Sequence, residues 1–209
     1  MDDYGALKLQ LKNSLSQQLF THSVNTARTA MALARRYESD PSQAYLAGLL
    51  HDCAKECAPQ YLLQTAIAFG IVRDDSEKRH PDLLHDRVGA LLAWKKYGIQ
   101  DKEVLTAIAV HTLGAETMGL LDKIVYIADL IEPGRDFPAV GGLRALAHQD
   151  LDRAVLIAMD NTISRVLQRG LFLHPQTVQA RNSLLLTATA STWERGENGP
   201  DKKEGYSEA

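Results

Sequence analysis

Apolar side chains recur at steps of three and four residues along almost the whole chain. Val24, Ala27, Ala30, Met31 and Ala34 form one such series, and this spacing places them on one face of a helix. A convincing alternation of apolar and polar residues, which would indicate strands, is absent. The pattern therefore predicts an all-α protein.

Helix-breaking residues divide this pattern into about eight to ten helices, short ones included. Pro41 stands where a helix begins, and Gly70 and Gly98 stand where helices end. Asp101 and Asp150 precede two further segments, where a short side-chain oxygen can accept a free backbone N–H. We expect a bundle of helices with these boundaries.

The chain is long enough for one domain with a substantial core, which we place at residues 1–190. Residues 191–209 contain mostly charged and small side chains, which bury too little apolar surface to offset the entropy of ordering. This segment is predicted to be a disordered tail. The polar segment 71–84, which contains a proline, is predicted to be a surface loop or short helix, a setting that often borders a site.

Charge and cysteine content exclude several classes of protein. The net charge is −3 and the pI is about 6.2, which argue against a nucleic-acid or anionic-membrane surface, since both need a basic footprint. Two cysteines, Cys53 and Cys57, are too few for a disulfide scaffold. The sequence has neither a secretory leader nor an apolar stretch of about 20 residues. We therefore expect a cytoplasmic protein without nucleic-acid or membrane partners.

Four residues form a candidate metal site. His22 begins an apolar helical pattern, His51-Asp52 closes the apolar run 47–50, and Asp129 interrupts the apolar run 124–131. Histidine with carboxylate suits iron, manganese or zinc better than an all-oxygen site would. Each residue alone has a simpler interpretation, as a core histidine or a paired carboxylate. The simpler interpretation fits Asp129 least well, because a carboxylate among apolar side chains is costly to bury unless it is paired or metal-bound.

His85 and His111 lie where apolar runs meet polar ones. They could hold a second metal, or they could meet substrate phosphate and act as general acids near neutral pH. We favour the phosphate role, because a second metal usually needs a further or bridging carboxylate that the sequence does not place. A solvent-facing histidine at a helix end is the alternative for each.

Three other side chains could contact a nucleotide. Arg135 follows a Pro-Gly turn six residues after Asp129, and a guanidinium there can bind phosphate in a bidentate manner. Tyr126 precedes Asp129 by three residues and could line the pocket or simply pack. Lys55 follows His51 by four residues and could reach a phosphate, although a solvated lysine is commoner.

Together these residues resemble a known family. The order of His22, His51-Asp52, His85, His111 and Asp129 resembles the HD superfamily of metal-dependent phosphohydrolases. The stretch from His111 to Arg144, with its Glu132-Pro133-Gly134-Arg135 segment, resembles more narrowly the YqeK family of bacterial HD hydrolases. This resemblance spans about residues 15–185, and the 111–144 stretch is its specific part.

The resemblance implies an all-helical HD domain that cleaves diadenosine tetraphosphate (Ap4A) symmetrically into two ADP, with iron as the expected metal. It also implies that His22, His51, Asp52 and Asp129 hold the metal, and that His85, His111 and Arg135 meet nucleotide phosphates. The chain departs from the family pattern at three positions: Leu19 where arginine is frequent, Asn25 where glycine is common, and Asp86 where a small or neutral residue usually stands. Because Leu19 replaces that arginine, one phosphate or nucleobase contact implied by the family pattern is in question.

Two other functions remain open from the sequence. The same HD site could serve another nucleotide, because HD folds share one site across several substrates. Alternatively, a non-catalytic helical binding module could use the metal for stability alone. A homodimer also remains open, because exposed apolar surface cannot be located from sequence.

Overall fold

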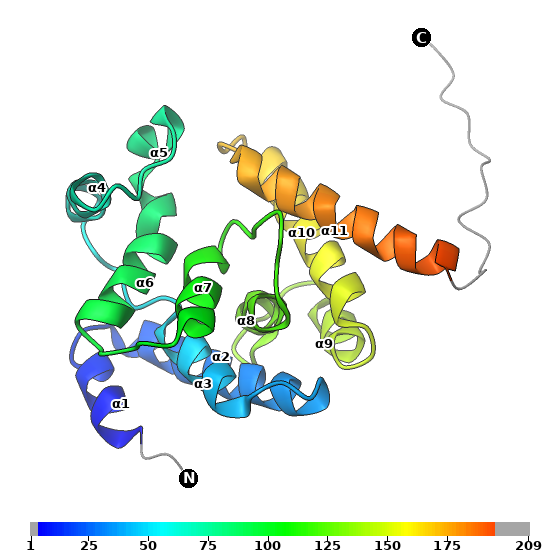
Figure 1. Ribbon diagram of the computed structural model, residues 1–209, viewed down its shortest axis with the longest axis horizontal. Coiled ribbons are helices and arrows are strands. Elements are labelled where there is room, and N and C mark those ends of the chain that lie inside the picture. Colours follow the sequence, from blue (N-terminus) through cyan, green and yellow to red (C-terminus); the bar gives the residue numbers. More distant parts are fainter. Residues whose placement is uncertain (1–3, 195–209) are drawn as a thin grey trace.

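Helices follow one another throughout residues 4–194, the part of the chain that this computed structural model describes (Figure 1). In order they are α1 (Gly5–Lys12), α2 (Gln17–Arg36), α3 (Pro41–Leu50), α4 (Pro59–Ala68), α5 (Asp75–Arg79), the 3-10 helix η1 (Pro81–Leu84), α6 (His85–Lys95), α7 (Lys102–Val110), α8 (Leu120–Ile131), α9 (Val140–Ala147), α10 (Leu151–Gln168) and α11 (Pro175–Glu194). None of the described residues forms a strand, which confirms the all-α prediction. The expected number of helices was slightly low.

The helix boundaries follow the local chemistry of the sequence. The Asp101 carboxylate accepts the backbone N–H of Glu103 at 2.9 Å, which caps α7. The Asp150 carboxylate caps α10 by accepting the N–H of Arg153 at 3.0 Å. Gly70 follows α4 with a φ of +63°, a left-handed conformation that glycine adopts without steric cost. These three predicted boundaries are confirmed.

The core forms where α2, α3, α7 and α8 pack against one another. Helix α8 is buried over most of its surface, and Ile124, Val125, Ile127 and Ala128 are fully enclosed. On α3, Gly48 lies so close to α2 that a Cβ atom at this position would stand 2.9 Å from Cα of Ala27. This close approach fixes the end of α3 against α2. Two of the predicted site residues, His51 and Asp52, directly follow this end of α3.

Two outer groups of helices flank this core (Figure 1). Helices α4, α5 and α6 lie on one side and enclose a smaller core made by Ala54, Leu62, Ala66, Leu84 and Val88. Helices α9, α10 and α11 lie on the other side, and α10 packs on α8. The site residues therefore come from the central helices and from the ends of α3, α6 and α7.

The structure agrees only in part with two predictions from the sequence, the surface segment 71–84 and the disordered tail 191–209. The segment 71–84 contains α5 and η1, and although most of its residues are exposed or partly exposed, Glu77 is fully buried. Helix α11 extends to Glu194, so it includes the first four residues of the predicted tail. Residues 195–209 lie outside the described part of the chain.

Among the described helices, none combines the length and the apolar character needed to cross a membrane.

Candidate metal centre and active site

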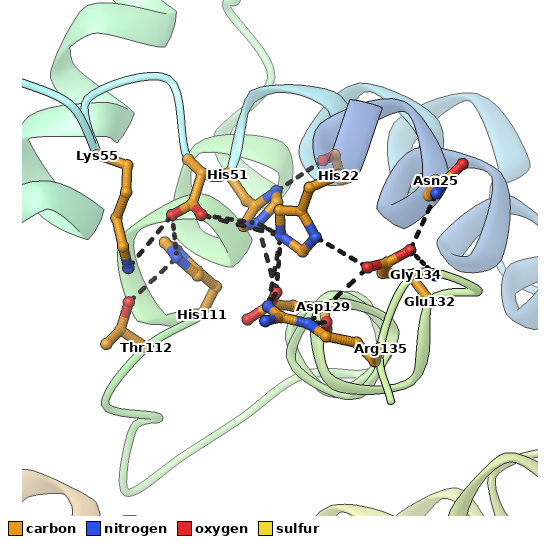
Figure 2. A network of polar contacts seen from close by, with 12 residues as sticks. His22, Asn25, His51, Lys55, His111, Thr112, Asp129, Glu132, Gly134 and Arg135 are labelled. Carbon is orange, nitrogen blue, oxygen red and sulfur yellow. Dashed lines mark hydrogen bonds and ion pairs between the residues drawn. The ribbon is translucent and has the colours of Figure 1, made fainter. Parts of the chain in front are cut away.

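All six predicted His and Asp side chains come together at one place. Figure 2 shows four of them, His22, His51, His111 and Asp129. His22 comes from α2, His51 and Asp52 from the segment directly after α3, His85 from the first residue of α6, His111 from the residue after α7, and Asp129 from α8. His51, His85, His111 and Asp52 are buried. The sequence prediction that these distant residues share a site is thus consistent with the observed geometry.

Backbone carbonyls fix the orientation of three of the histidines. Nδ1 of His51 lies 2.7 Å from the carbonyl oxygen of Gly48, Nδ1 of His85 lies 2.6 Å from that of Asp82, and Nδ1 of His111 lies 2.7 Å from that of Ile108. In each case the acceptor is three residues earlier in the chain. Because a carbonyl oxygen can only accept, each Nδ1 carries a proton and each Nε2 is directed into the site.

The fourth histidine, His22, is held by a carboxylate instead. Its Nδ1 lies 3.2 Å from Oε1 of Glu132, which is buried at the end of α8. Oε2 of Glu132 accepts hydrogen bonds from Nδ2 of Asn25 at 3.0 Å and from the backbone N–H of Gly134 at 2.6 Å. A histidine whose far nitrogen donates to a carboxylate is the usual arrangement of a metal ligand.

The ligand atoms around His22 have separations that suit one metal ion. Nε2 of His22 lies 2.9 Å from Oδ1 of Asp129 and 3.2 Å from Nε2 of His51, and Nε2 of His51 lies 3.5 Å from Oδ2 of Asp52. Metal–ligand bonds of about 2.0–2.2 Å at angles of about 90–110° put neighbouring ligand atoms about 3–3.5 Å apart. His22, His51 and Asp129 therefore form one group whose chemistry and spacing suit a divalent cation, and His51 and Asp52 form a second such group with His111.

Asp52 faces both pairs of histidines. Its Oδ2 is directed to His22 and His51, whereas its Oδ1 lies 3.3 Å from Nε2 of His85 and 3.2 Å from Nε2 of His111. The sequence argument against a second metal assumed that no carboxylate stands beside His85 and His111. The structure places such a carboxylate there, because Asp52 contacts both pairs of histidines through its two oxygens.

Burial and ion pairing act in opposite directions on the acidic groups. Burial alone would raise the pKa of Asp52, but His51 and the hydrogen bonds from His111 and His85 outweigh it and hold this pKa well below its usual value. Burial would likewise raise the pKa of Asp129, yet hydrogen bonds from His22 and His51 keep it well below the usual range. Both carboxylates are therefore ionised at neutral pH.

The two most buried histidines differ in pKa. Burial lowers the pKa of His51, but the charges of Asp52 and Asp129 outweigh it and raise the value to about 10 when no cation is bound. For His111, burial is the larger effect and leaves its pKa below the usual value, despite the hydrogen bond to Asp52. His111 is therefore neutral near pH 7.

Two cationic side chains border the centre. Arg135 donates from Nη2 to Oδ1 of Asp129 at 2.5 Å and from Nε to the backbone carbonyl of Asp129 at 2.8 Å. Nζ of Lys55 lies 2.9 Å from Nε2 of His85 and 3.7 Å from Oδ1 of Asp52. Both side chains are partly exposed, so their charge can reach a bound anion.

Two cavities border this centre. The larger has a volume of about 830 Å³ and lies on the His22 side, and the smaller, of about 270 Å³, lies on the His111 side. Lys55, Asp129 and Arg135 line both cavities. Tyr126 lines the smaller one and is buried, which raises the pKa of its phenol. The structure is consistent with both predicted roles of Tyr126, packing in the core and lining the pocket.

Sequence reasoning missed several residues that support the site. Glu132 was named only within the Glu132-Pro133-Gly134-Arg135 segment, without a role in the site. Thr112 was not considered, although its Oγ1 lies 3.1 Å from Nε2 of both His85 and His111. Arg144 holds the turn before Arg135 by donating to the carbonyl oxygens of Ile131, Glu132 and Arg135 at 2.8–2.9 Å. The one signal in the sequence that could have found Glu132 is its position directly after the apolar run 124–131, between Asp129 and Arg135.

The two cysteines have no part in the centre. Cys53 is buried and Cys57 is partly buried, and both are free thiols. Burial raises the pKa of Cys53 to about 12, which makes it unreactive as a nucleophile or ligand. The interpretation of Cys53 as a structural thiol agrees with this environment.

Comparison with known proteins gives consistent results. A model of the HD domain matches residues 19–134. A symmetrical bis(5'-nucleosyl)-tetraphosphatase from Halalkalibacterium halodurans is 36% identical, and the match covers 87% of this chain and 96% of the relative. The enzyme of the same name from Bacillus subtilis is 35% identical, with coverages of 84% and 94%. The crystal structure of a predicted HD superfamily hydrolase involved in NAD metabolism, from Clostridium acetobutylicum, has a TM-score of 0.86 at 42% identity and covers 90% of this chain and 99% of that one.

Proposed function

The chain belongs to the HD family and, within it, to the symmetrical bis(5'-nucleosyl)-tetraphosphatases, and on this premise we propose that it hydrolyses Ap4A into two ADP. The observation that carries the proposal is the convergence of four histidine Nε2 atoms on two carboxylates, at a place that two cavities border. A dinucleoside polyphosphate with a central phosphate bridge matches this arrangement. The substrate partner is therefore a small molecule.

We propose that His22, His51, Asp52 and Asp129 hold one divalent metal ion. Iron is the expected ion, and manganese or zinc would also suit this mixture of imidazole and carboxylate. A divalent cation bound there supplies hydroxide near neutral pH by lowering the pKa of water, and it offsets negative charge on a phosphoryl oxygen. Attack of hydroxide on one of the two central phosphorus atoms, in line with its bond to the oxygen that bridges them, would break that P–O bond. One ADP would carry the new oxygen, and the other would leave with the bridging oxygen and take up a proton there if the leaving group is protonated.

The two cationic residues act together on the phosphate chain in this reaction. Arg135 and Lys55 bind the phosphate chain and offset the charge that develops on its oxygens. Arg135 is held toward the centre by its two bonds to Asp129. Because both cations are next to the metal ligands, they would hold the central phosphates at the point of cleavage.

His85 and His111 are proposed to meet the phosphates and to serve the leaving ADP. His85 is the favoured residue to meet the leaving ADP, because its Nε2 faces the site and Nζ of Lys55 lies within hydrogen-bond reach of it at 2.9 Å. His111 is a weaker acid catalyst candidate, since burial lowers its pKa and leaves it neutral. It would instead accept a hydrogen bond or orient the phosphate chain.

A direct assay tests the proposal. Protein purified without oxygen and supplied with ferrous iron is incubated with Ap4A, and the products are separated by ion exchange. ADP as the sole product is expected. AMP with ATP, or hydrolysis of other nucleotides from a panel while Ap4A persists, would overturn the assigned reaction. An Asp129→Ala variant that kept full metal content and full activity would overturn the assigned site.

Location and assembly are further expectations. Free Cys53 and Cys57 suit a reducing compartment, which supports the proposed cytoplasmic location. A homodimer is left as a prediction that light scattering of the metal-loaded protein can test. Neither affects the assignment of the reaction.

A further inference from the structure

Gln176, in the first turn of α11, joins two segments that lead to the site histidines. Its Nε2 donates to the carbonyl oxygen of Gly114 at 2.5 Å, and its Oε1 accepts a hydrogen bond from Nη1 of Arg73 at 2.8 Å. A carbonyl can only accept and a guanidinium can only donate, so these partners fix the orientation of the amide. Gln176 is partly buried and lines neither of the two cavities at the centre. Its side chain therefore connects protein segments and lies outside the substrate space.

Gly114 ends the turn that carries His111 and Thr112. The backbone N–H of Gly114 donates to the carbonyl oxygen of the last residue of α7 at 2.8 Å, which closes the turn around these two residues. Oγ1 of Thr112 lies 3.1 Å from Nε2 of His111 and 3.1 Å from Nε2 of His85. The bond from Gln176 to Gly114 therefore acts on the turn that places His111 beside His85.

This turn lies directly against α10 and α11 (Figure 1). Gly114 has a φ of +71°, and a Cβ atom there would stand 2.7 Å from Cε of Met159 on α10 and 2.8 Å from Cβ of Ala180 on α11. Such apolar contacts hold the turn close but are non-directional. The hydrogen bond from Gln176 supplies the direction, because it requires the Gly114 carbonyl to face the start of α11.

The Arg73 end of the same amide leads to His85. The backbone N–H of Arg73 donates to Oε2 of Glu77 at 2.8 Å, and Oε1 of Glu77 accepts a hydrogen bond from Nη2 of Arg87. Arg87 is on α6, two residues after His85. The glutamine amide thus contacts one segment that carries a site histidine and, through the Glu77–Arg87 pair, is connected to the other.

We propose that Gln176 is a positioning residue for the hydrolysis, and that it sets the separation of His85 and His111 through its bond to Gly114. The inference rests on the proposed function, in which these two histidines meet the phosphates of the leaving ADP. The centroids of their rings are 5.2 Å apart, and the ring planes are at 72°. A displacement of about 1 Å at the reacting groups can lower a rate about 100-fold. Loss of this remote contact therefore lowers kcat although every group that touches the substrate is still present.

Variants at Gln176 separate its two bonds. Gln176→Leu removes both and should lower kcat for Ap4A about tenfold, with KM within about twofold of the wild-type value. Gln176→Glu keeps the acceptor for Arg73 but loses the donor to Gly114, so it should be as slow as Gln176→Leu. Arg73→Met removes only the other bond and should lose less of kcat. Gln64→Leu, at an exposed position on α4, is the matched control and should have the wild-type kcat.

A double-mutant cycle tests whether Gln176 acts through His111. In a His111→Asn background, Gln176→Leu should change kcat by less than about twofold, because the residue that it positions is already gone. A general structural defect would lower kcat by the same factor in both backgrounds, and urea unfolding would show a matching loss of stability. Equal factors in the two backgrounds, or wild-type kcat in Gln176→Leu, would overturn the assignment.

A crystal structure of Gln176→Leu, compared with one of the wild-type protein, gives a measurement that does not depend on activity. The rings of His85 and His111 should change their separation by more than about 0.5 Å, the tolerance of a productive site, whereas those of His22 and His51 should keep theirs. An unchanged separation of His85 and His111 would contradict the positioning role even if Ap4A is cleaved to ADP. If the wild-type protein does not cleave Ap4A, the proposed function itself fails, and the ring separation still shows whether Gln176 positions the pair.

Discussion

Oε1 of Glu132 lies 3.2 Å from Nδ1 of His22, so a buried carboxylate orients the one site histidine that has no backbone carbonyl at its Nδ1. We predict that Glu132→Ala weakens metal binding about 10- to 100-fold, the usual cost of losing such a partner. The measurement is a competition between the protein and a chelator of known affinity.

Conservative changes at the same contact separate orientation from general damage. Glu132→Gln keeps an acceptor oxygen and should lose less affinity than Glu132→Ala. Asn25→Ala removes a donor to the other oxygen of Glu132 but leaves the His22 contact, so its effect should be smaller still. An alanine variant at Glu132 with unchanged metal affinity would show that His22 does not depend on this carboxylate.

Metal binding should release a proton from His51. Without a cation, Asp52 and Asp129 raise the pKa of His51 to about 10, so at pH 7 the imidazole is protonated, whereas a metal ligand must be neutral. Affinity should therefore rise with pH up to about 10. Calorimetric titration at pH 7 in two buffers of different ionisation enthalpy measures the released proton, and identical heats in both buffers would contradict the prediction.

The same raised pKa predicts the pH dependence of the metal-free fold. A group whose pKa is higher in the folded state than in the unfolded chain stabilises the fold while it is protonated. For His51 this contribution is complete below its ordinary pKa of 6.5 and is lost as pH rises through about 10. Urea unfolding of chelated protein at pH 6 and pH 10 tests this, and the metal-loaded protein, in which His51 is already neutral, should lack this loss.

Metal stoichiometry decides between the two roles of His85 and His111. We predict one tightly bound ion per chain, which His22→Ala removes and His85→Ala leaves in place. Because Oδ1 of Asp52 reaches His85 and His111 at 3.3 and 3.2 Å, a second ion is the competing outcome. Two ions per chain, one of them lost in His85→Ala, would make these histidines metal ligands and Asp52 a bridge between the ions.

The sequence was informative about which residues form the site and less so about how they are arranged. His22, His51, Asp52 and Asp129 could be selected because metal-ligand side chains at the ends or inside of apolar runs are unusual. The two-sided contact of Asp52 depends on the packing of α3 on α7 and of α7 on α6, which no local pattern encodes. The bond from His22 to Glu132 spans 110 positions, and it too follows only from tertiary packing.

The fold shows the same division between local and distant information. Caps such as Asp101 and Asp150 were predictable because their partners lie two or three residues away. Glu77 was assigned to a surface segment because its neighbours in sequence are polar, yet it is fully buried. Its burial depends on Arg87, which is ten positions away on α6 and could not be identified as its partner from sequence.

This buried pair gives a prediction about stability. Arg87 donates from Nη2 to Oε1 of Glu77 and from Nη1 to the carbonyl oxygen of Ile71 at 3.1 Å, and Nε2 of His174 lies 3.4 Å from Glu77. Removing one member leaves a buried charge without its partner, which costs about 3–5 kcal/mol. Arg87→Met should therefore lower the free energy of unfolding by that amount, as measured by urea denaturation of the metal-loaded protein.

A double variant and a pH series identify the cause. Glu77→Leu combined with Arg87→Met removes both charges and should recover most of the loss, because an apolar pair of similar size is tolerated. Burial would raise the pKa of Glu77, but Arg87 outweighs it and lowers this pKa below its ordinary 4.5. The contribution of the pair is therefore complete above that pH and is lost as pH falls through the lowered pKa. A double variant no more stable than Arg87→Met, with the same acid sensitivity as wild type, would show that the packing of α5 on α6 stabilises this side of the molecule without the charges.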